Sequence, residues 1–581
     1  MKYFYKIAVM SICLIITALF TSACGGGGGK STPQNNSSLY YLLAQQNNQQ
    51  QEQNNNENNN NNENNNEEQI TQTEVTISLT DSLNADKIAK ADIYYKVEST
   101  AKTAEEPKDQ EILKAEPTAN DKTKFTLPIN DKAENVKIKA VLTYDSEGNL
   151  LDYFSSANGV ISENGNFNVD FENSKDVDGF GGGSGTEDDP YIISAPRHFM
   201  NINKMFISND ILTDMKTAEM LDNEMISEIK SKGEISQNEN GIYISQDDIP
   251  DETLDLILAY YSSVGTDSPY LYLDKHFKQT EDLDFTHLTG LKIVKTENDK
   301  NITIETTNEK APFYNNGKGI TPIGHYNPNI ATLYLSSVFG PITINQEDIA
   351  VFLAQFFFKG DYDGDNHTID GLIFANGKSI NIAKYLPNSM QIVIDYIPNY
   401  MTILSLFVGS YDGNFTNITI GENSIYFIDN SNTDNTNNVS PQNSLRKAVF
   451  IPIDENTDNF AKTYFGISGL CFQAHGSNFE NCTNKAKIVI KNTNYFGLKI
   501  SGLIENCQST TLTNCTNNGN ITIDNVTKTN ASSLIHTFSG LNIDMLIGNP
   551  DNNVTEENCT YDGVITVENQ AINGRTYPAN N

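Results

Sequence analysis

Tryptophan is absent from this 581-residue chain, and arginine occurs only at Arg197, Arg446 and Arg575. Any stacking against sugar rings must therefore use the 27 tyrosines and 28 phenylalanines. Basic residues are also scarce relative to acidic ones, 39 against 74, which gives a formal net charge of −35 at pH 7. Nucleic acid and bare anionic lipid require clustered positive charge on the protein, so the composition argues against both as partners.

Catalytic and metal-binding motifs are missing as well. No two of the seven histidines have the H-E-x-x-H spacing of zinc peptidases, and no C-x-x-C pair accompanies the cysteines. Without a nucleophile–base pair or a metal-ligand spacing, the sequence predicts no catalytic residue, no metal and no cofactor.

Residues 1–23 resemble a bacterial lipoprotein signal peptide. Two lysines precede an uncharged run at 7–20, which is shorter than the about 20 residues of a membrane helix but suits an export signal. Small residues then lead to Cys24, as in the lipobox, although Thr21 stands where that motif usually has leucine. The resemblance implies a lipid on Cys24 and anchoring in a bacterial membrane. An ordinary cleaved signal with an incidental cysteine is the alternative.

Residues 24–70 are predicted to form a tether. Five glycines follow Cys24, and the stretch 45–69 is almost entirely Asn, Gln and Glu. Such a segment has too little apolar surface to offset its ordering entropy, so we expect it to be disordered. A coil of this length spans about 40 Å and would lift a folded body off the membrane. We therefore expect an exported, lipid-anchored protein at the cell surface.

Residues 71–175 carry short strand-like runs separated by polar turns. Six of these runs show partial alternation of apolar and polar side chains, as in "KFTLPI" and "FNVDFE". Six or seven strands in about 100 residues predict an antiparallel β-sandwich of immunoglobulin-like shape. No catalytic constellation is present in this region, which favours a spacer role.

The chain from about 180 to 575 resembles, with insertions, bacterial surface proteins with right-handed parallel β-helices, many of which carry the glycine-containing GLUG repeat, and the predicted β-helix domain is 176–581. The similar segments follow the order seen in that group: "GGSGTEDDPYIIS" (182–194), "FKQTEDLDF" (277–285), "TPIG" (321–324), "FKGDYDGDNHTIDGLIF" (358–374) and "LSLFVGSYDGNFTNITI" (404–420). The resemblance implies a parallel β-helix that begins after a glycine-rich hinge at 176–194. Some members of the group are IgA-cleaving metallopeptidases, but the H-E-x-x-H signature of their catalytic domain is absent, so that activity does not transfer.

An internal repeat supports the β-helix independently. "ISGLCFQAHGSNFENCTNKAKIVI" from Ile467 matches "ISGLIENCQSTTLTNCTNNGNITI" from Ile500, an offset of 33 residues. A looser third copy places Cys559 44 residues after Cys515, so we expect that coil to carry an insertion. Self-similarity at a fixed period indicates a solenoid, in which stacking buries the inward side chains.

Five cysteines lie in the repeat region: Cys471, Cys482, Cys507, Cys515 and Cys559. Three of them occupy the same N-C-T position in successive copies, so we expect Cys482 directly beneath Cys515, about 4.8 Å away. A column of small buried thiols is the favoured interpretation. Disulfides formed after export are the alternative.

An insertion at 197–275 is predicted to be helical. The segment 208–233 places its apolar residues, several of them methionines, on one stripe and ends at a glycine, which predicts a helix with a packing face. A second helix is predicted over 247–263, with a hairpin around Asn240 between the two. The tyrosine-rich stretch 259–273 is the candidate contact surface, although core packing explains several of its tyrosines equally well.

A cluster of carboxylates occurs in "DYDGDNHTID", which contains Asp361, Asp363, Asp365 and Asp370. Hard cations such as Ca²⁺ prefer several oxygen ligands. The EF-hand pattern fails, because Gly364 comes too early and no glutamate closes the loop. We therefore favour a turn over a calcium site.

Three classes of function are compatible with the sequence. A binding or adhesion protein displayed on the cell surface, with a host or microbial glycan or protein as ligand, is favoured. A β-helix polysaccharide lyase or hydrolase is the first alternative, and a structural surface protein without a specific ligand is the second. Recognition is expected at the insertion and at the interruptions 291–320, 326–357 and 421–464, because loops on a rigid scaffold commonly carry binding residues.

Overall fold

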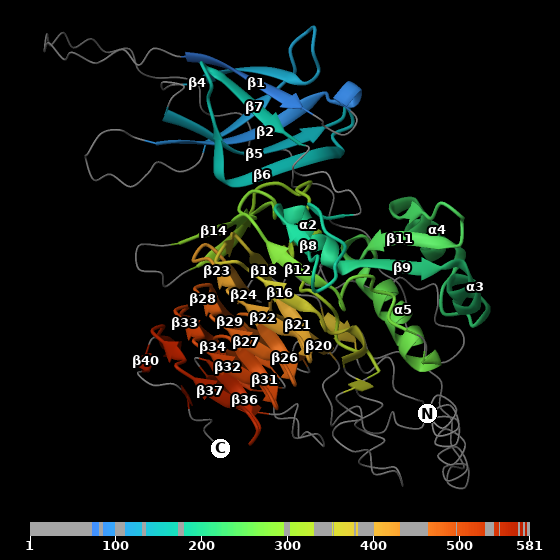
Figure 1. Cartoon of the computed structure of the whole chain (residues 1–581), viewed down its shortest axis with the longest axis vertical. Helices are drawn as coiled ribbons and strands as arrows, with labels where there is room; N and C mark the ends of the chain where they lie inside the picture. Colours follow the sequence, from blue (N-terminus) through green and yellow to red (C-terminus); the bar gives the residue numbers. More distant parts are fainter. Residues whose placement is uncertain are drawn as a thin grey trace, which may run out of the picture.

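The architecture is mainly β, with several large parallel sheets, as predicted (Figure 1). In this computed structural model the described residues are 73–80, 85–98, 111–129, 135–171, 179–265, 267–295, 302–329, 351–352, 354–376, 379–381, 400–429, 463–495, 497–528, 540–544, 546–567, 570–572 and 576–577. Two small sheets lie at one end of a long stack of coils, and a helical subdomain lies at the side of that stack. The predicted signal peptide, Cys24 and the tether lie outside the described residues.

Two facing sheets form the first folded unit. One has the order β4–β1–β7 and the other β3–β2–β5–β6. Their strands are β1 (Thr73–Thr80), β2 (Lys90–Val97), β3 (Glu111–Ala115), β4 (Lys124–Ile129), β5 (Val136–Tyr144), β6 (Leu150–Ile161) and β7 (Asn166–Asp170). Inward residues from both sheets, such as Ile77, Ile93 and Phe167, share one buried core. β1 and β7 pair in parallel, so the prediction of a wholly antiparallel arrangement is wrong at this pair. The reason is that the chain crosses to the other sheet between these strands and returns in the same direction.

The glycine-rich segment after β7 is packed in its described part, where a hinge was predicted. Phe180 is 1% exposed and stacks on Tyr191, with ring centroids 4.4 Å apart. Gly185 has a φ of +76°, and a Cβ at this position would lie only 2.2 Å from the Tyr191 ring. A residue larger than glycine would displace that ring. The described part of the segment is therefore packed against Tyr191 and forms the beginning of the first coil.

The stack of coils is built from five sheets, to which each complete coil contributes one strand apiece. The first sheet contains β8 (Tyr191–Ile193), β12 (His276–Gln279), β16 (Asp361–Asp363), β22 (Asn414–Thr416), β27 (Asn478–Glu480), β32 (Thr511–Thr513) and β37 (Thr555–Glu557). The second contains β13 (Leu283–Asp284), β17 (Thr368–Asp370), β23 (Thr419–Ile420), β28 (Thr483–Asn484), β33 (Thr516–Asn517) and β38 (Thr560–Tyr561). The third contains β18 (Ile373–Ala375), β24 (Ile425–Asp429), β29 (Lys487–Tyr495), β34 (Ile521–Lys528), β39 (Ile565–Val567) and β40 (Gln570–Ile572).

The two remaining sheets complete each turn of the stack. The fourth contains β19 (Ser379–Asn381), β20 (Tyr400–Leu404), β25 (Thr463–Ser468), β30 (Gly497–Ser501), β35 (Gly540–Asp544) and β41 (Thr576–Tyr577). The fifth contains β21 (Phe407–Tyr411), β26 (Cys471–His475), β31 (Ile504–Gln508) and β36 (Ile547–Pro550). Pairing within the five sheets is parallel, apart from β19, β40 and β41, which pair antiparallel with their neighbours. A separate hairpin of β14 (Leu291–Val294) and β15 (Thr303–Thr306) covers the upper part of the third sheet.

The strand register follows the repeat in the sequence. Phe479 pairs with Leu512 and Asn484 pairs with Asn517, both at the predicted offset of 33 residues. One coil later, Leu512 pairs with Glu556 at an offset of 44 residues. Most of the extra residues fall between β34 and β35, so the predicted insertion is confirmed and the columns of inward residues stay aligned.

A column of aromatic rings fills the interior beneath the first sheet. Phe415 and Phe479 are both fully buried, and their rings stack with centroids 4.7 Å apart and planes 3° from parallel. This separation matches the spacing of neighbouring strands, so these two coils place one ring directly on the other, and Leu512 continues the buried column in the next coil.

Asparagines at the turns form a second column that runs along the outside. Asn417, Asn481 and Asn514 have φ values of 57°, 53° and 54°, in the left-handed region that asparagine tolerates better than most residues. The Asn514 amide donates to Asn481 at 3.1 Å, and the Asn481 amide donates to Asn417 at 3.0 Å. Each asparagine therefore both closes its own turn and bonds to the next coil.

The helical subdomain divides the first predicted helix into two. It contains α2 (Pro196–Met200), β9 (Lys204–Ser208), α3 (Asn209–Thr217), α4 (Asn223–Lys232), β10 (Glu234–Ile235), β11 (Gly241–Ser245) and α5 (Asp251–Val264). The single helix predicted over 208–233 is two helices, because Glu219 adopts a φ of 55° and the Asp222 carboxylate caps α4 by accepting from the Met225 N–H at 2.9 Å. The β10–β11 hairpin is present as predicted. Within the described ranges, no helix combines the length and apolarity needed to cross a membrane.

One methionine and two tyrosines of the subdomain are core residues. Met215 is fully buried, as the packing interpretation of the methionines predicts. Tyr261 and Tyr270 are 6% and 7% exposed, so the proposed contact surface at 259–273 is wrong for these two residues, which belong to the core. The TPIG segment holds the subdomain on the coils, because the Pro322 carbonyl accepts from the Gln246 amide at 3.1 Å.

Candidate functional site

The aspartates considered as calcium ligands each have a different partner. Asp361 lies 2.8 Å from His276 Nδ1, and Asp365 forms an ion pair with Lys278 at 3.1 Å. Asp363 accepts from the Asp365 N–H at 2.9 Å and from the amide of Asn417 at 3.0 Å. These contacts describe a turn that begins the asparagine column. Among the described residues, no group of three or more His, Cys, Asp or Glu is arranged to hold a metal ion.

The cysteines lie where the repeat placed them. The N–H after Cys515 donates to the Cys482 carbonyl at 2.8 Å, and the N–H after Cys559 donates to the Cys515 carbonyl at 2.9 Å, so the three follow one another on successive coils. These three, together with Cys471 and Cys507, are free thiols, and all except the half-buried Cys559 are buried. Burial raises the pKa of Cys471 and Cys507 well above the usual value, which keeps both thiols protonated and unreactive.

The first folded unit is fastened to the coils by buried polar contacts. Arg197 of α2 donates to the Asp152 carboxylate at 2.7 Å, and its guanidinium lies 4.4 Å from the centre of the Tyr153 ring. The Ser155 hydroxyl donates to the Asp284 carbonyl at 2.7 Å. Residues of β2 and β5 also join the hydrophobic core of the coils. The two parts therefore form one continuous body, which makes a simple spacer role for the first unit less favourable.

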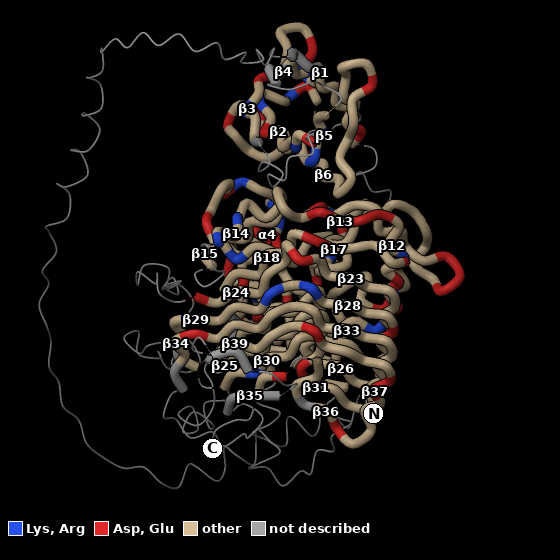
Figure 2. The backbone as a smooth tube through the Cα atoms, turned by 90° about the vertical axis from the view of Figure 1, so that its left-hand side faces the viewer, with Lys and Arg blue, Asp and Glu red and all other residues tan. Residues whose placement is uncertain are grey.

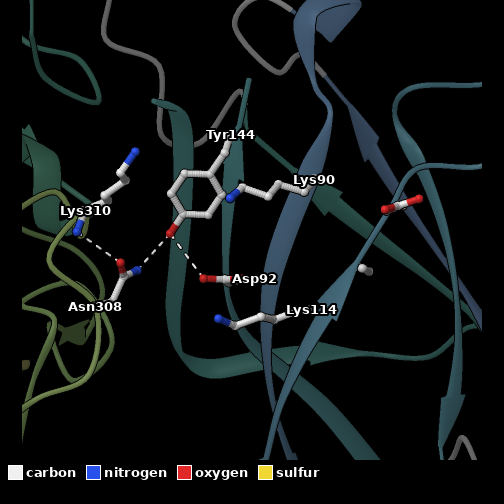
Figure 3. A pocket seen from close by; sticks show the side chains of 8 residues that line it. Lys90, Asp92, Lys114, Tyr144, Asn308 and Lys310 are labelled. Atoms are coloured by element: carbon white, nitrogen blue, oxygen red, sulfur yellow. Dashed lines mark hydrogen bonds between the residues drawn. The ribbon is translucent and has the colours of Figure 1, made fainter. Parts of the chain in front are cut away.

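A pocket of about 270 Å³ opens at this junction (Figure 3). Strands β2, β3 and β5 supply one wall, and the loop after β15 supplies the other. Its polar lining consists of Lys90, Asp92, Lys114, Glu116, Tyr144, Asn308 and Lys310. Figure 2 shows Lys and Arg positions on both sides of the junction, near β5 and β6 and near β14 and β15.

The floor of the pocket is a short hydrogen-bonded chain. The buried Tyr144 hydroxyl donates to Asp92 Oδ2 at 3.3 Å and accepts from the Asn308 amide at 2.8 Å, so it joins the two walls. Burial is the largest cause that holds the pKa of Tyr144 well above its usual value, and the charge of Asp92 raises it further. The hydroxyl is therefore a permanent donor, and the Asp92 and Asn308 side chains are fixed in place.

The rim of the pocket collects positive charge. A Cβ placed on Gly148 would lie 3.0 Å from Lys310 Nζ and 3.5 Å from Lys90 Nζ, so both ammonium groups gather over the same glycine. Lys310 Nζ donates to the Gly148 carbonyl at 2.6 Å, and Lys90 Nζ lies 5.3 Å from the centre of the Tyr144 ring. Lys114 is exposed and has no hydrogen-bond or ion-pair partner among the described residues. With the carboxylates of Asp92 and Glu116, the lining has three positive and two negative groups, in a chain with a net charge of −35.

Sequence reasoning missed this pocket. Its residues come from three strands of the first unit and from a loop more than 150 positions further along the chain. The only signal was the interruption at 291–320, which was expected to carry recognition and which supplies Asn308 and Lys310.

The junction also contains a buried histidine. His287 stacks on Tyr94 with ring centroids 4.2 Å apart, and burial lowers the pKa of His287 to about 4. The nearby charge of Lys139 lowers this pKa further, while Asp284 opposes the shift. The imidazole is therefore neutral in the folded protein at every pH above about 5.

Acid is expected to weaken the protein through His287. As the pH falls below about 6.5, His287 of the unfolded chain binds a proton, whereas the buried imidazole of the folded protein stays neutral. The free energy of unfolding should therefore drop by about 2 kcal/mol between pH 7 and pH 5. Denaturant unfolding of the wild type and of His287→Phe at both pH values measures the effect. If both proteins show the same change with pH, the assignment to His287 is wrong.

A buried carboxyl lies at the far end of the stack. Glu505 of β31 is 2% exposed, and its Oε2 has no hydrogen-bond partner among the described residues. A Cβ on Gly548 would lie 1.7 Å from that oxygen, so the carboxyl packs directly against this glycine. Burial is the main cause that raises the pKa of Glu505 to about 8; Asp544 adds to the shift and Lys499 opposes it. Glu505 is therefore mostly protonated at neutral pH.

Comparison with known proteins adds no family to this picture. No family model, no curated protein and no solved structure matches the chain.

Proposed function

We propose that the chain is a lipid-anchored protein of the bacterial cell surface whose folded body binds a ligand outside the cell. The observation that supports this proposal best is the junction pocket, in which three lysines collect despite the strongly acidic composition. Lysines that gather at a concave site of an otherwise acidic protein favour recognition of a ligand at that site. The predicted signal, Cys24 and the tether suit display.

The finer description of the fold belongs to the same proposal. We infer a right-handed parallel β-helix of the GLUG-containing kind, preceded by an immunoglobulin-like sandwich. Connections between parallel strands of one sheet are right-handed almost without exception, which supports this handedness. The stacked, parallel coils provide a rigid support on which the first unit and the hairpin of β14 and β15 meet.

A polysaccharide lyase or hydrolase is the alternative. It would need titratable groups that converge on a bound substrate. Glu505, whose raised pKa suits a general acid, is 2% exposed, so substrate cannot reach it. The titratable groups that do converge are those of the junction pocket, where Asp92 and Glu116 lie beside three lysines. Binding without turnover stays the proposal, and the product measurement described below tests it against this alternative.

The membrane anchor is tested by removing the thiol that would carry the lipid. Cys24→Ala should move the protein from the detergent phase to the aqueous phase in a detergent-partition assay, because it removes every acyl chain. Cys482→Ala is the matched control and should partition like the wild type. Equal partitioning of Cys24→Ala and the wild type would refute the lipoprotein assignment.

The binding function is tested with the purified full chain in detergent. It is incubated with an array of glycoproteins and polysaccharides, and both retention and new reducing ends or unsaturated sugars are measured. Retention of at least one component without new products is expected. Product formation would favour the enzyme alternative, and the absence of any retention would favour a structural role.

A further inference from the structure

We infer that the junction pocket binds a sugar residue that carries a single carboxylate, as uronic and sialic acids do. This inference rests on the proposed binding function and names the class of its ligand. The pocket of about 270 Å³ is smaller than the about 300–1,000 Å³ of sites that hold drug-sized ligands, so it suits the end or a single residue of a longer chain.

The positive rim identifies the sign of the ligand. Lys90 and Lys310 bring two ammonium groups over Gly148, and neither forms an ion pair with a described carboxylate. Lys114 approaches from β3 and has no partner among the described residues. A carboxylate placed between these groups would receive charge-assisted hydrogen bonds and would relieve the repulsion between the ammonium groups.

The floor and the second wall identify the rest of the ligand. Asp92 and Glu116 are hydrogen-bond acceptors, and Asn308 and Tyr144 are held in one orientation by their mutual bond. Two carboxylates at the same pocket would repel a phosphate, which carries close to two negative charges, more strongly than a singly charged carboxylate, and they would accept hydrogen bonds from hydroxyl groups. A ligand with one negative group and several hydroxyls satisfies both walls, and an acidic sugar has that combination.

Ring stacking plays little part in this site. Tyr144 is 3% exposed and Lys90 covers its ring, so no aromatic face is open to the ligand. Recognition therefore depends on charge and hydrogen bonds, and the affinity should fall as salt is added.

The test uses pairs of saccharides in which one member is the acid and the other its uncharged methyl ester. Titration calorimetry with the full chain in detergent compares trigalacturonate with its methyl ester, and sialyllactose with the methyl ester of its sialic acid. One acidic member should bind more tightly than its neutral counterpart. The double variant Lys90→Gln/Lys114→Gln should reduce that affinity by about tenfold or more, as expected for loss of charge-assisted hydrogen bonds. Lys230→Gln, which removes one exposed charge on α4, is the control and should leave it unchanged.

Other outcomes overturn the inference. Equal binding of acidic and neutral saccharides, binding that the double variant does not change, or displacement of the saccharide by equimolar inorganic phosphate would each exclude an acidic-sugar site here. If the double variant still retains the same components of the glycoprotein array as the wild type, the proposed binding function stands and this pocket is not its site. If neither protein retains any component, both proposals fail.

Discussion

Replacing Phe479 by alanine is expected to lower the free energy of unfolding by about 3–5 kcal/mol, which is the usual cost of removing a buried aromatic ring. Phe479 is fully buried and stacks on Phe415 at a centroid distance of 4.7 Å, and its backbone pairs with Leu512 of the next coil. The cavity left by the ring should stay unfilled, because the hydrogen bonds between paired strands keep neighbouring coils at a constant spacing.

The measurement is denaturant unfolding followed by circular dichroism. Glu480→Ala is the matched control, since this neighbouring side chain is exposed, and it should change the stability by no more than about 0.5 kcal/mol. A loss below about 1 kcal/mol for Phe479→Ala would show that the aromatic column does not hold the coils together.

Replacing Glu505 by glutamine is expected to abolish a large pH dependence of stability. The unfolded chain releases this proton near pH 4.5, whereas the folded protein keeps it until about pH 8. Deprotonation therefore favours the unfolded chain, and the wild type should lose about 2–3 kcal/mol through Glu505 as the pH rises from 5 to 7. Glutamine has no proton to lose and should be free of this decline.

The sign of this effect is opposite to that of His287, whose contribution increases with pH over the same range. Only the difference between variant and wild type isolates Glu505, so both proteins are unfolded in denaturant at pH 5, 6 and 7. The stability of Glu505→Gln relative to the wild type should rise steadily with pH, while Glu480→Gln, at an exposed position, should show no trend. A constant difference between Glu505→Gln and the wild type would mean that Glu505 is ionised in the folded protein at neutral pH.

Repetition made the coils predictable. The offset of 33 residues between Ile467 and Ile500 is the pairing offset of β25 and β30, because in a stack of parallel coils each side chain packs on its counterpart one repeat away. The same argument placed Cys482 next to Cys515. Such columns need only local information, since one coil repeats the environment of the previous one.

Single elements without a repeat were predicted less well. The apolar stripe over 208–233 continues past the point where the chain leaves the helix, so periodicity alone could not reveal the break. The break depends on Glu219 taking a left-handed conformation and on the Asp222 carboxylate capping the next helix. Likewise, the tyrosines of 259–273 have the composition of a contact surface, and only their packing against the coils shows that Tyr261 and Tyr270 are core residues.

The sequence by itself determined the mainly β fold, the register of the coils and the turn at Asp363, because these depend on alternation, repetition and local turn chemistry. Only the tertiary structure decided that the first unit shares a core with the coils and that Lys90, Tyr144 and Lys310 meet in one pocket. Those residues lie on separate strands and on a distant loop, and nothing in their local sequence records the distance between them. Their proximity results from the way the two sheets dock on the end of the stack, which is determined by packing over the whole junction.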